Sequence, residues 1–335
     1  MLVTGGAGLV GSHLCERLLA GGDRIVCMDN FSSGAEENVS HLLAHPRFEL
    51  VRQDVEHPFR LAVDRIYHLA CPAAAVGPRR DPVQTMRTCF LGTLHALDLA
   101  RRTGARMLFV SGAEVYGDAE VHPQPEDYPG RVSATSARAC LEEGKRAAET
   151  LCFDFARQHG ARVKVARLFD VYGPRMRADD DRDVARLAVA ALRSKPLRVP
   201  GDGSQAKSYC YVTDVADALI RFMKAPLSFA GPLNLGSDLE TPAADLARRI
   251  AALAGSASPV VFEGEAEGPA RRCPDLALAK SKLKWAPVTD LDEGLRRTIA
   301  HFRRLLGLPQ PAPVLPGVAP EAVPEQFRAQ VEGAV

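Results

Sequence analysis

Short apolar runs alternate with longer amphipathic stretches over the first 170 residues of the chain. This alternation is typical of a parallel β-sheet with helices on both faces. We expect strands over Met1–Thr4, Arg24–Met28, Phe48–Arg52, Arg65–Leu69, Arg106–Ser111 and Val163–Arg167. Helices are expected over Ser12–Ala20, Asp81–Arg102 and Ala137–His159. The pattern therefore predicts an α/β fold of the Rossmann type, built on a doubly wound parallel sheet.

The alternation weakens after Arg167, where loops that contain Gly and Pro separate shorter elements. We expect residues 1–170 to form a Rossmann domain, and residues 171–305 to form mainly a smaller C-terminal substrate lobe, partly interleaved with the first. Residues 306–335 are rich in proline and lack periodicity, which predicts a tail. The strand over Met1–Thr4 is short for a central strand, which indicates either a cost in stability or a truncated N-terminus.

Charge and cysteine usage exclude several classes of function. The 42 Lys and Arg residues balance 41 Asp and Glu residues, so net charge gives no support for binding nucleic acid or a membrane surface. The eight cysteines are scattered without a CxxC pair, and the Asp179–Asp181 run is interpreted as a solvated loop, so we expect no metal site. No apolar run approaches the roughly 20 residues that span a bilayer, which predicts a cytoplasmic protein.

A glycine-rich stretch follows the first expected strand. Gly6, Gly8 and Gly11 have the GxGxxG spacing, which lets a backbone approach a pyrophosphate at a helix N-terminus. The next strand ends at Asp29, close to the offset at which a carboxylate binds the adenosine ribose and repels a 2′-phosphate. The spacing therefore predicts NAD rather than NADP, with Asp54 as a candidate for the adenine side.

Several longer motifs resemble one family. They are TGGAGLVGSHL, DNFSSG, IYHLACPA, EVYGDAEVHPQPEDY, ARACLEEGKRAAET, RLFDVYGPRM, GDGSQAKSYCYVTD and RCPD. From about residue 3 to about residue 304 the chain resembles the extended short-chain dehydrogenase/reductases, and among them the UDP-glucuronate decarboxylases. The resemblance implies a UDP-sugar bound beside NAD. The NAD-binding residues that it implies, together with the glycine motif, are Gly5, Gly8, Leu9, Val10, Gly11, Asp29, Asn30, Asp54, Val55, Leu69, Ala70 and Lys145.

The same resemblance implies a reaction and the groups that perform it. In that family NAD oxidises the sugar at C4, the β-keto acid loses carbon dioxide, and NADH returns the hydride. A Tyr moves the protons with help from a Lys four residues later, a Ser or Thr holds the sugar hydroxyl, and a Glu completes the site. Lys145 and Glu114 match the Lys and the Glu. The Tyr position is Leu141 and the Ser/Thr position is Gly112.

An alignment error does not explain the missing tyrosine, because no Tyr in this chain is followed by Lys four positions later. Further departures affect the sugar side, where Pro78 stands at an aromatic position, Cys89 and Asp170 stand at Asn positions, and Lys207 replaces an Arg. The residues expected to contact substrate are Asp170, Arg182, Lys207, Tyr211 and Arg272. The sequence thus retains the features that bind NAD and alters those that process a sugar.

Three hypotheses follow. The first is an inactive or strongly impaired decarboxylase-like protein, a pseudoenzyme that binds NAD. The second is an active nucleotide-sugar decarboxylase, dehydratase or epimerase that uses Glu114, Glu142 or Cys140 as the base. The third is a structural partner of an active homologue. The two long helices near Asp81–Arg102 and Ala137–His159 predict a homodimer, or a heteromer with such a homologue.

Overall fold

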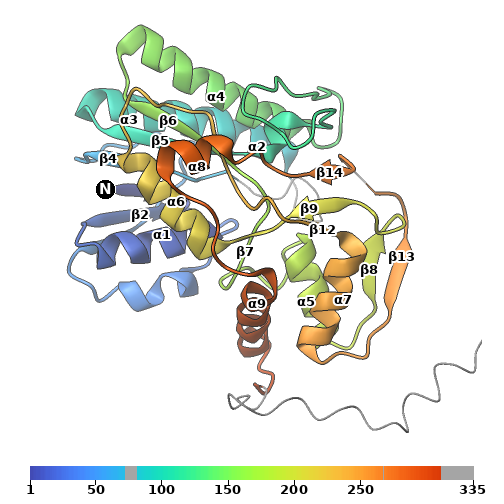
Figure 1. Cartoon of the computed structure of the whole chain (residues 1–335). Helices are drawn as coiled ribbons and strands as arrows, with labels where there is room; N and C mark the ends of the chain where they lie inside the picture. Colours follow the sequence, from blue (N-terminus) through green and yellow to red (C-terminus); the bar gives the residue numbers. More distant parts are fainter. Residues whose placement is uncertain (72–80, 267, 311–335) are drawn as a thin grey trace, which may run out of the picture.

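The computed structural model describes residues 1–71, 81–266 and 268–310 (Figure 1). Its centre is a seven-stranded parallel sheet with the strand order β3-β2-β1-β4-β5-β6-β11. Six of these strands lie within one residue of the predicted bounds: β1 Leu2–Thr4, β2 Ile25–Asp29, β3 Phe48–Arg52, β4 Arg65–His68, β5 Arg106–Gly112 and β6 Val163–Leu168. The predicted Rossmann-type fold is confirmed.

The seventh strand comes from much later in the chain. Strand β11 (Leu233–Leu235) pairs in parallel with β6, with Leu233 opposite Ala166 and Leu235 opposite Leu168. Three residues are too few for a hydropathy pattern to identify a strand. The central sheet therefore draws on chain segments from both sides of residue 170.

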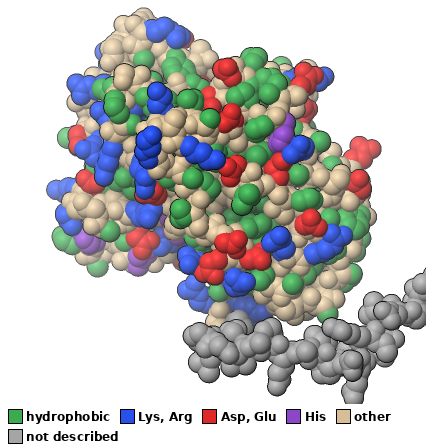
Figure 2. All heavy atoms as spheres, in the orientation of Figure 1, with side chains coloured by type: hydrophobic (Ala, Val, Ile, Leu, Met, Phe, Trp, Pro, Cys, Tyr) green, Lys and Arg blue, Asp and Glu red, His purple; other side chains and the backbone are tan. Residues whose placement is uncertain are grey.

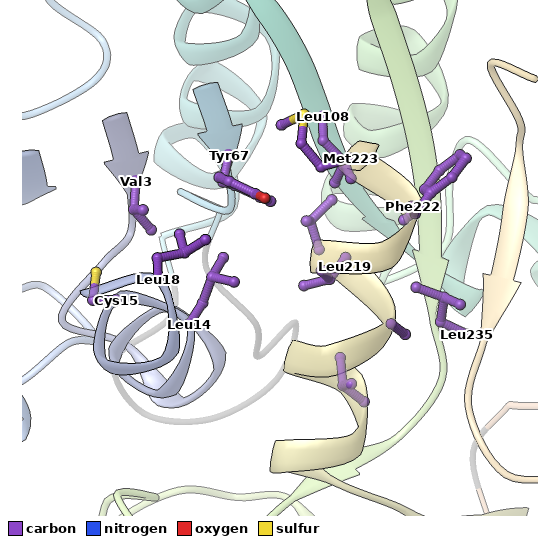
Figure 3. Close-up of a cluster of buried hydrophobic side chains, with 14 of the residues drawn as sticks. Val3, Leu14, Cys15, Leu18, Tyr67, Leu108, Leu219, Phe222, Met223 and Leu235 are labelled. Carbon is purple, nitrogen blue, oxygen red and sulfur yellow. The ribbon is translucent and has the colours of Figure 1, made fainter. Parts of the chain in front are cut away.

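Helices cover both faces of the sheet (Figure 1). On one face lie α1 (Leu9–Ala20), α6 (Val212–Lys224) and α8 (Ala277–Leu283). Figure 3 shows Leu14 and Leu18 of α1, and Leu219 and Phe222 of α6, pointing into one buried cluster beside Tyr67. On the other face, α3 (Thr93–Thr103) and α4 (Ala139–His159) cover a second cluster.

The helix expected over Asp81–Arg102 is not continuous. It consists of α2 (Pro82–Arg87), a π-helical turn η3 (Thr88–Gly92) and α3. Asp81 caps α2, because its carboxylate accepts a hydrogen bond of 2.9 Å from the N–H of Gln84. A π-helical turn inserts a residue without changing hydropathy, so the sequence pattern does not reveal it.

The C-terminal lobe has its own core, around α5 (Asp183–Leu192), α7 (Ala243–Ala254) and α9 (Leu291–Leu305). Its remaining elements are β7 Val171–Tyr172, β8 Leu197–Pro200, β9 Ala206–Ser208, β10 Cys210–Tyr211, β12 Glu240–Pro242, β13 Val260–Glu263 and β14 Arg271–Arg272. Short 3-10 turns complete the description: η1 Glu36–Asn38, η2 Ser40–Leu42 and η4 Ala113–Tyr116.

The surface carries both signs of charge. On the face shown in Figure 2, Lys and Arg side chains are interspersed with Asp and Glu. Within the described residues, no helix is both long and apolar enough to cross a bilayer.

Candidate functional site

A cavity of about 540 Å³ lies at the carboxyl ends of β1, β2, β4, β5 and β6. Ligands of open parallel sheets bind at this edge, where the strand order reverses. Here the reversal occurs at β1, which pairs with β2 on one side and β4 on the other. The cavity is lined by most residues predicted from the sequence: Gly5, Gly8, Leu9, Val10, Gly11, Asp29, Asn30, Val55, Leu69, Ala70, Gly112, Glu114, Lys145, Asp170, Arg182 and Arg272.

The turn from β1 into α1 requires glycine at two positions. Gly5 has φ +67°, and a Cβ there would lie 2.9 Å from the backbone nitrogen of Ala70. A Cβ at Gly11 would lie 2.1 Å from the carbonyl oxygen of Gly5. The first turn of α1 therefore packs against the glycine turn that follows β1, and its N–H groups and positive dipole end lie at the cavity. This is the arrangement that binds a pyrophosphate.

Asp29 braces this loop and also faces the cavity. Its Oδ2 accepts a hydrogen bond of 2.9 Å from the N–H of Ala7, and its Oδ1 accepts one of 2.8 Å from the N–H of Phe31. Burial raises the pKa of this carboxyl, and the two N–H groups oppose the increase. Each oxygen has a second lone pair. The carboxylate can therefore accept hydrogen bonds from ribose hydroxyls without leaving the loop.

Asp54 does not line the cavity, although the sequence analysis predicted it as a candidate contact on the adenine side of NAD. Its Oδ2 accepts a hydrogen bond of 2.8 Å from Nδ2 of Asn30, and its Oδ1 accepts one of 2.9 Å from the N–H of Glu56. Asp54 thus positions Asn30, which does line the cavity together with Gln53 and Val55.

Glu114 and Lys145 form the corner where the family's reaction groups are expected. Glu114 Oε2 lies 3.9 Å from Lys145 Nζ. Burial alone would raise the pKa of the Glu114 carboxyl, but the cations of Lys145 and Arg272 outweigh it, so the pKa is lower than usual. Burial opposes the charge of Lys145 in the same way, yet Glu114 and Cys71 raise its pKa. Both groups are therefore held in their charged forms.

The space beside Gly112 is filled by this carboxylate. A Cβ at Gly112 would lie 2.1 Å from Glu114 Oε2 and 3.1 Å from Lys145 Nζ. The backbone of Gly112 is extended, with φ −154° and ψ 172°, so nothing in its conformation requires glycine. Glu114 occupies the place where a Ser or Thr side chain would begin.

Leu141, Glu142 and Cys140 lie in the first turn of α4, outside the cavity lining. Leu141 is buried and has no atom that transfers a proton. Glu142 forms an ion pair of 2.6 Å with Arg138. Of the three alternative bases suggested by the sequence, the structure brings only Glu114 to the cavity.

The cations on the sugar side are each placed beside an acid. Within the described residues, Arg182 pairs with Asp180 at 2.6 Å, and Arg177 pairs with Asp179 at 2.8 Å. Arg272 NH1 lies 3.9 Å from Asp170 Oδ2, which is too far for a hydrogen bond. An incoming phosphate therefore competes with these carboxylates for the guanidinium groups.

Lys207 and Tyr211 do not line the cavity. Lys207 Nζ donates to Asp183 Oδ2 at 2.8 Å, which holds it against the start of α5. The ring of Tyr211 packs edge-on against Tyr172, with centroids 5.7 Å apart, in the core of the C-terminal lobe. Both positions depend on tertiary contacts that a motif does not contain. Pro78 lies outside the described residues.

Sequence reasoning missed Ser111 and Cys71, which both line the cavity. The hydroxyl of Ser111 is buried and forms no hydrogen bond within the described residues. Cys71 directly follows Ala70 in the IYHLACPA motif, so its position next to a predicted NAD-binding residue is the sequence signal that could have identified it.

Comparisons with known proteins agree with this architecture. Residues 1–236 match the model of the NAD dependent epimerase/dehydratase family. UDP-glucuronic acid decarboxylase 3 of Arabidopsis thaliana is 44% identical over 312 residues, which cover 92% of this chain and 91% of that protein. The UDP-glucose 4-epimerase of Thermotoga maritima, solved with UDP-glucose, is 29% identical, with a TM-score of 0.80 over 91% of this chain and 99% of that one. The UDP-glucuronic acid 4-epimerase of Bacillus cereus, solved with UDP-glucuronic acid and NAD, is 25% identical, with a TM-score of 0.81 and the same coverage.

Proposed function

Because this chain belongs to the NAD-dependent epimerase/dehydratase family and has UDP-glucuronic acid decarboxylases among its relatives, we propose that it binds NAD and a UDP-sugar but decarboxylates UDP-glucuronate very slowly or not at all. It is then a pseudoenzyme of the decarboxylase type. The observation that carries the proposal is the lack of a hydroxyl at the two positions where the family has one, since Gly112 has no side chain beside Lys145 and Leu141 is a buried aliphatic residue.

The cavity fits NAD on the chain's own geometry. Gly5 and Gly11 leave room for a pyrophosphate at the N-terminus of α1, and Asp29 presents a carboxylate to the ribose. NAD, when bound, supplies hydride transfer. Lys145 keeps a positive charge at the reaction corner, and Glu114 balances that charge.

The missing groups account for a large part of the reaction barrier. Loss of a general acid or base costs about 10²- to 10⁴-fold in rate, which corresponds to about 3 to 5 kcal/mol. A leucine at position 141 offers no replacement, because its side chain neither holds nor releases a proton. The carboxylate of Asp170 weakens the hold of Arg272 on a diphosphate as well.

The second candidate is an active enzyme with Glu114 as the base. It is favoured by one observation, namely that the Glu114 carboxylate lines the cavity 3.9 Å from Lys145. Its lowered pKa makes it a weak base, which argues for slow proton abstraction.

The test combines binding and turnover on one preparation. Calorimetry should find NAD binding tighter than NADP binding, and Asp29→Ala should narrow the difference. Incubation with NAD and UDP-glucuronate should produce neither carbon dioxide nor UDP-xylose above background. Robust turnover would refute the proposal that decarboxylation is impaired. If the Glu114→Gln variant then lost that turnover, the second candidate would be supported. Equal affinity for NAD and NADP would refute the cofactor assignment.

Assembly is part of the proposal. Val83, Met86 and Phe90 are exposed on α2 and η3 at a spacing of three and four residues, which places them on one side of the helix. Such a side supports a homodimer through α2, α3 and α4, or a heteromer with an active homologue in which this chain is the structural partner. Light scattering at micromolar concentration tests the homodimer, and a monomer would count against it. The cytoplasmic location expected from the sequence stays part of the proposal.

A further inference from the structure

Two cysteines from separate elements meet at the edge of the cavity. Cys71 follows β4, and Cys89 lies in the π-helical turn η3. Their Sγ atoms are 2.6 Å apart, and both residues are thiols in this structure. A disulfide bond is about 2.05 Å long, so the two sulfur atoms need to approach by only about half an ångström.

The two thiols differ in their surroundings. Cys71 lines the cavity, whereas Cys89 is 1% exposed. Cys89 is wedged beneath α4, since a Cβ at Gly144 would lie 3.1 Å from the Cβ of Cys89. Among the described residues, Cys71 is thus in contact with the cavity, whereas Cys89 is buried and does not line it.

The electrostatic surroundings shift the pKa values of the two thiols in opposite directions. The hydrogen bond with Cys89 lowers the pKa of the Cys71 thiol, burial opposes this, and the Lys145 cation lowers it further. The same hydrogen bond and burial raise the pKa of Cys89. Of the two thiols, Cys71 is therefore the one that loses its proton more readily.

We propose that Cys71 and Cys89 form a dithiol modification site that reacts with a peroxide and closes into a disulfide. A cysteine that lines a cavity and has a second cysteine sulfur 2.6 Å away is the arrangement found in redox-sensitive sites. The site does not depend on the proposed function, because the cofactor and the sugar take no part in it.

The chemistry balances in two steps. The Cys71 thiolate attacks one peroxide oxygen, an S–O bond forms, the O–O bond breaks, and hydroxide leaves and takes a proton to become water. Cys89 then loses its proton and attacks the sulfenic sulfur, so that the S–S bond forms, the S–O bond breaks and a second water leaves. The two cysteines lose two electrons to the peroxide, and a dithiol reductant returns them.

The chain contains a matched internal control. Cys15 and Cys27 are also neighbours, since a Cβ at Gly6 would lie 2.5 Å from Cys27 Sγ and 3.4 Å from Cys15 Sγ. Both are fully buried in the core, and neither lines the cavity. If sulfur proximity alone determined oxidation, this pair would react like the first. If access from the cavity determines it, this pair stays reduced.

The test treats the full chain with hydrogen peroxide, alkylates the remaining thiols, and identifies the tryptic peptides by mass. Cys71 and Cys89 lie on different tryptic peptides, so their disulfide appears as a linked pair that is two hydrogens lighter than the separate peptides. We expect this link to form about tenfold faster in folded protein than in urea, because the fold holds the two sulfur atoms 2.6 Å apart. Dithiothreitol should reverse it.

Single substitutions separate the two steps. Cys89→Ser should stop the reaction at a sulfenic acid on Cys71, which dimedone traps, and Cys71→Ser should leave Cys89 unoxidised. Cys152→Ser, at a buried position in α4 away from the pair, should leave the link unchanged. Two results would overturn the proposal. One is that Cys71 and Cys89 are alkylated to the same extent with and without peroxide treatment. The other is a Cys15–Cys27 disulfide that forms as fast as the Cys71–Cys89 disulfide.

Discussion

Restoring the two missing groups should restore decarboxylation. The perturbation is Leu141→Tyr combined with Gly112→Thr, which places a proton carrier four residues before Lys145 and a hydroxyl at the end of β5. The tyrosine should return about 10²- to 10⁴-fold in rate, or about 3 to 5 kcal/mol of the barrier. The threonine should add to this by orienting the sugar hydroxyl.

The structure predicts how the two substitutions depend on each other. A Cβ at position 112 would lie 2.1 Å from Glu114 Oε2, so Gly112→Thr must move the Glu114 carboxylate away from its present place. The extended backbone at Gly112 accepts any residue, so the cost lies in moving that carboxylate and, to a smaller extent, the Lys145 ammonium 3.1 Å from the new Cβ. Gly112→Thr by itself should therefore give almost no activity, because it disturbs the Glu114–Lys145 pair and supplies no proton carrier. Leu141→Tyr alone should give less than the double variant.

Fold stability provides the control for this experiment. Leu141 is 2% exposed, and a larger side chain in a closed site typically costs about 1–3 kcal/mol. Leu141→Phe with Gly112→Thr should show the same loss of stability in urea but no turnover, since it lacks the hydroxyl. The assay is release of labelled carbon dioxide from UDP-glucuronate together with chromatography of UDP-xylose. A double variant that binds NAD and UDP-glucuronate but remains silent would refute the reasoning.

Three further predictions follow from charged groups that are mostly shielded from solvent. Asp170→Asn removes the carboxylate 3.9 Å from Arg272 and should tighten UDP binding by about tenfold in calorimetry; unchanged affinity would contradict the competition between carboxylate and phosphate. In the wild type, a carboxylate oxygen of Glu149 lies 2.8 Å from the guanidinium of Arg167, whose side chain is only 12% exposed. Glu149→Ala removes that acid and should lower the unfolding free energy in urea by about 3–5 kcal/mol. A loss below about 1 kcal/mol would exclude a structural role for the pair. Burial and the nearby Arg106 cation lower the pKa of Lys164 from 10.5 to about 8. Between these pH values Lys164 is protonated in the unfolded chain but neutral in the folded one, so the free energy of unfolding should increase as the pH rises through this range. Lys164→Met should reduce the slope of unfolding free energy against pH in this range, and an unchanged slope would show that other groups cause it.

The sequence predicts the central strands well because each is an apolar run that ends in a polar or glycine position. It does not predict η3, since the extra residue at Thr88–Gly92 leaves the spacing of apolar side chains nearly unchanged. Strand β11 is also missed, because three residues form no pattern and only the pairing with β6 identifies them.

For the site, motif spacing led to the glycine loop and to Gly112 and Lys145, which line the cavity, and to Leu141, which lies outside its lining. It did not predict that Asp183 holds Lys207, because that pair joins β9 to α5 across the lobe. Nor did it predict that Asp54 lies behind Asn30, where hydrogen-bond geometry rather than strand order determines the position. Both contacts join residues from different elements, and motif spacing along the chain does not contain that information.

Strand β11 also constrains how this protein can fold and be recombined. A fragment that ends at residue 170 would expose the outer edge of β6 as a row of unpaired N–H and C=O groups, and it would lack α6, which covers Leu14 and Leu18. During synthesis the sheet remains incomplete until residue 235 has left the ribosome, so the first six strands wait for a partner from far along the chain. A chimera that takes its first half from this chain and its second half from a relative inherits the same demand: the new segment must match β6 in register and fill the groove that α6 occupies.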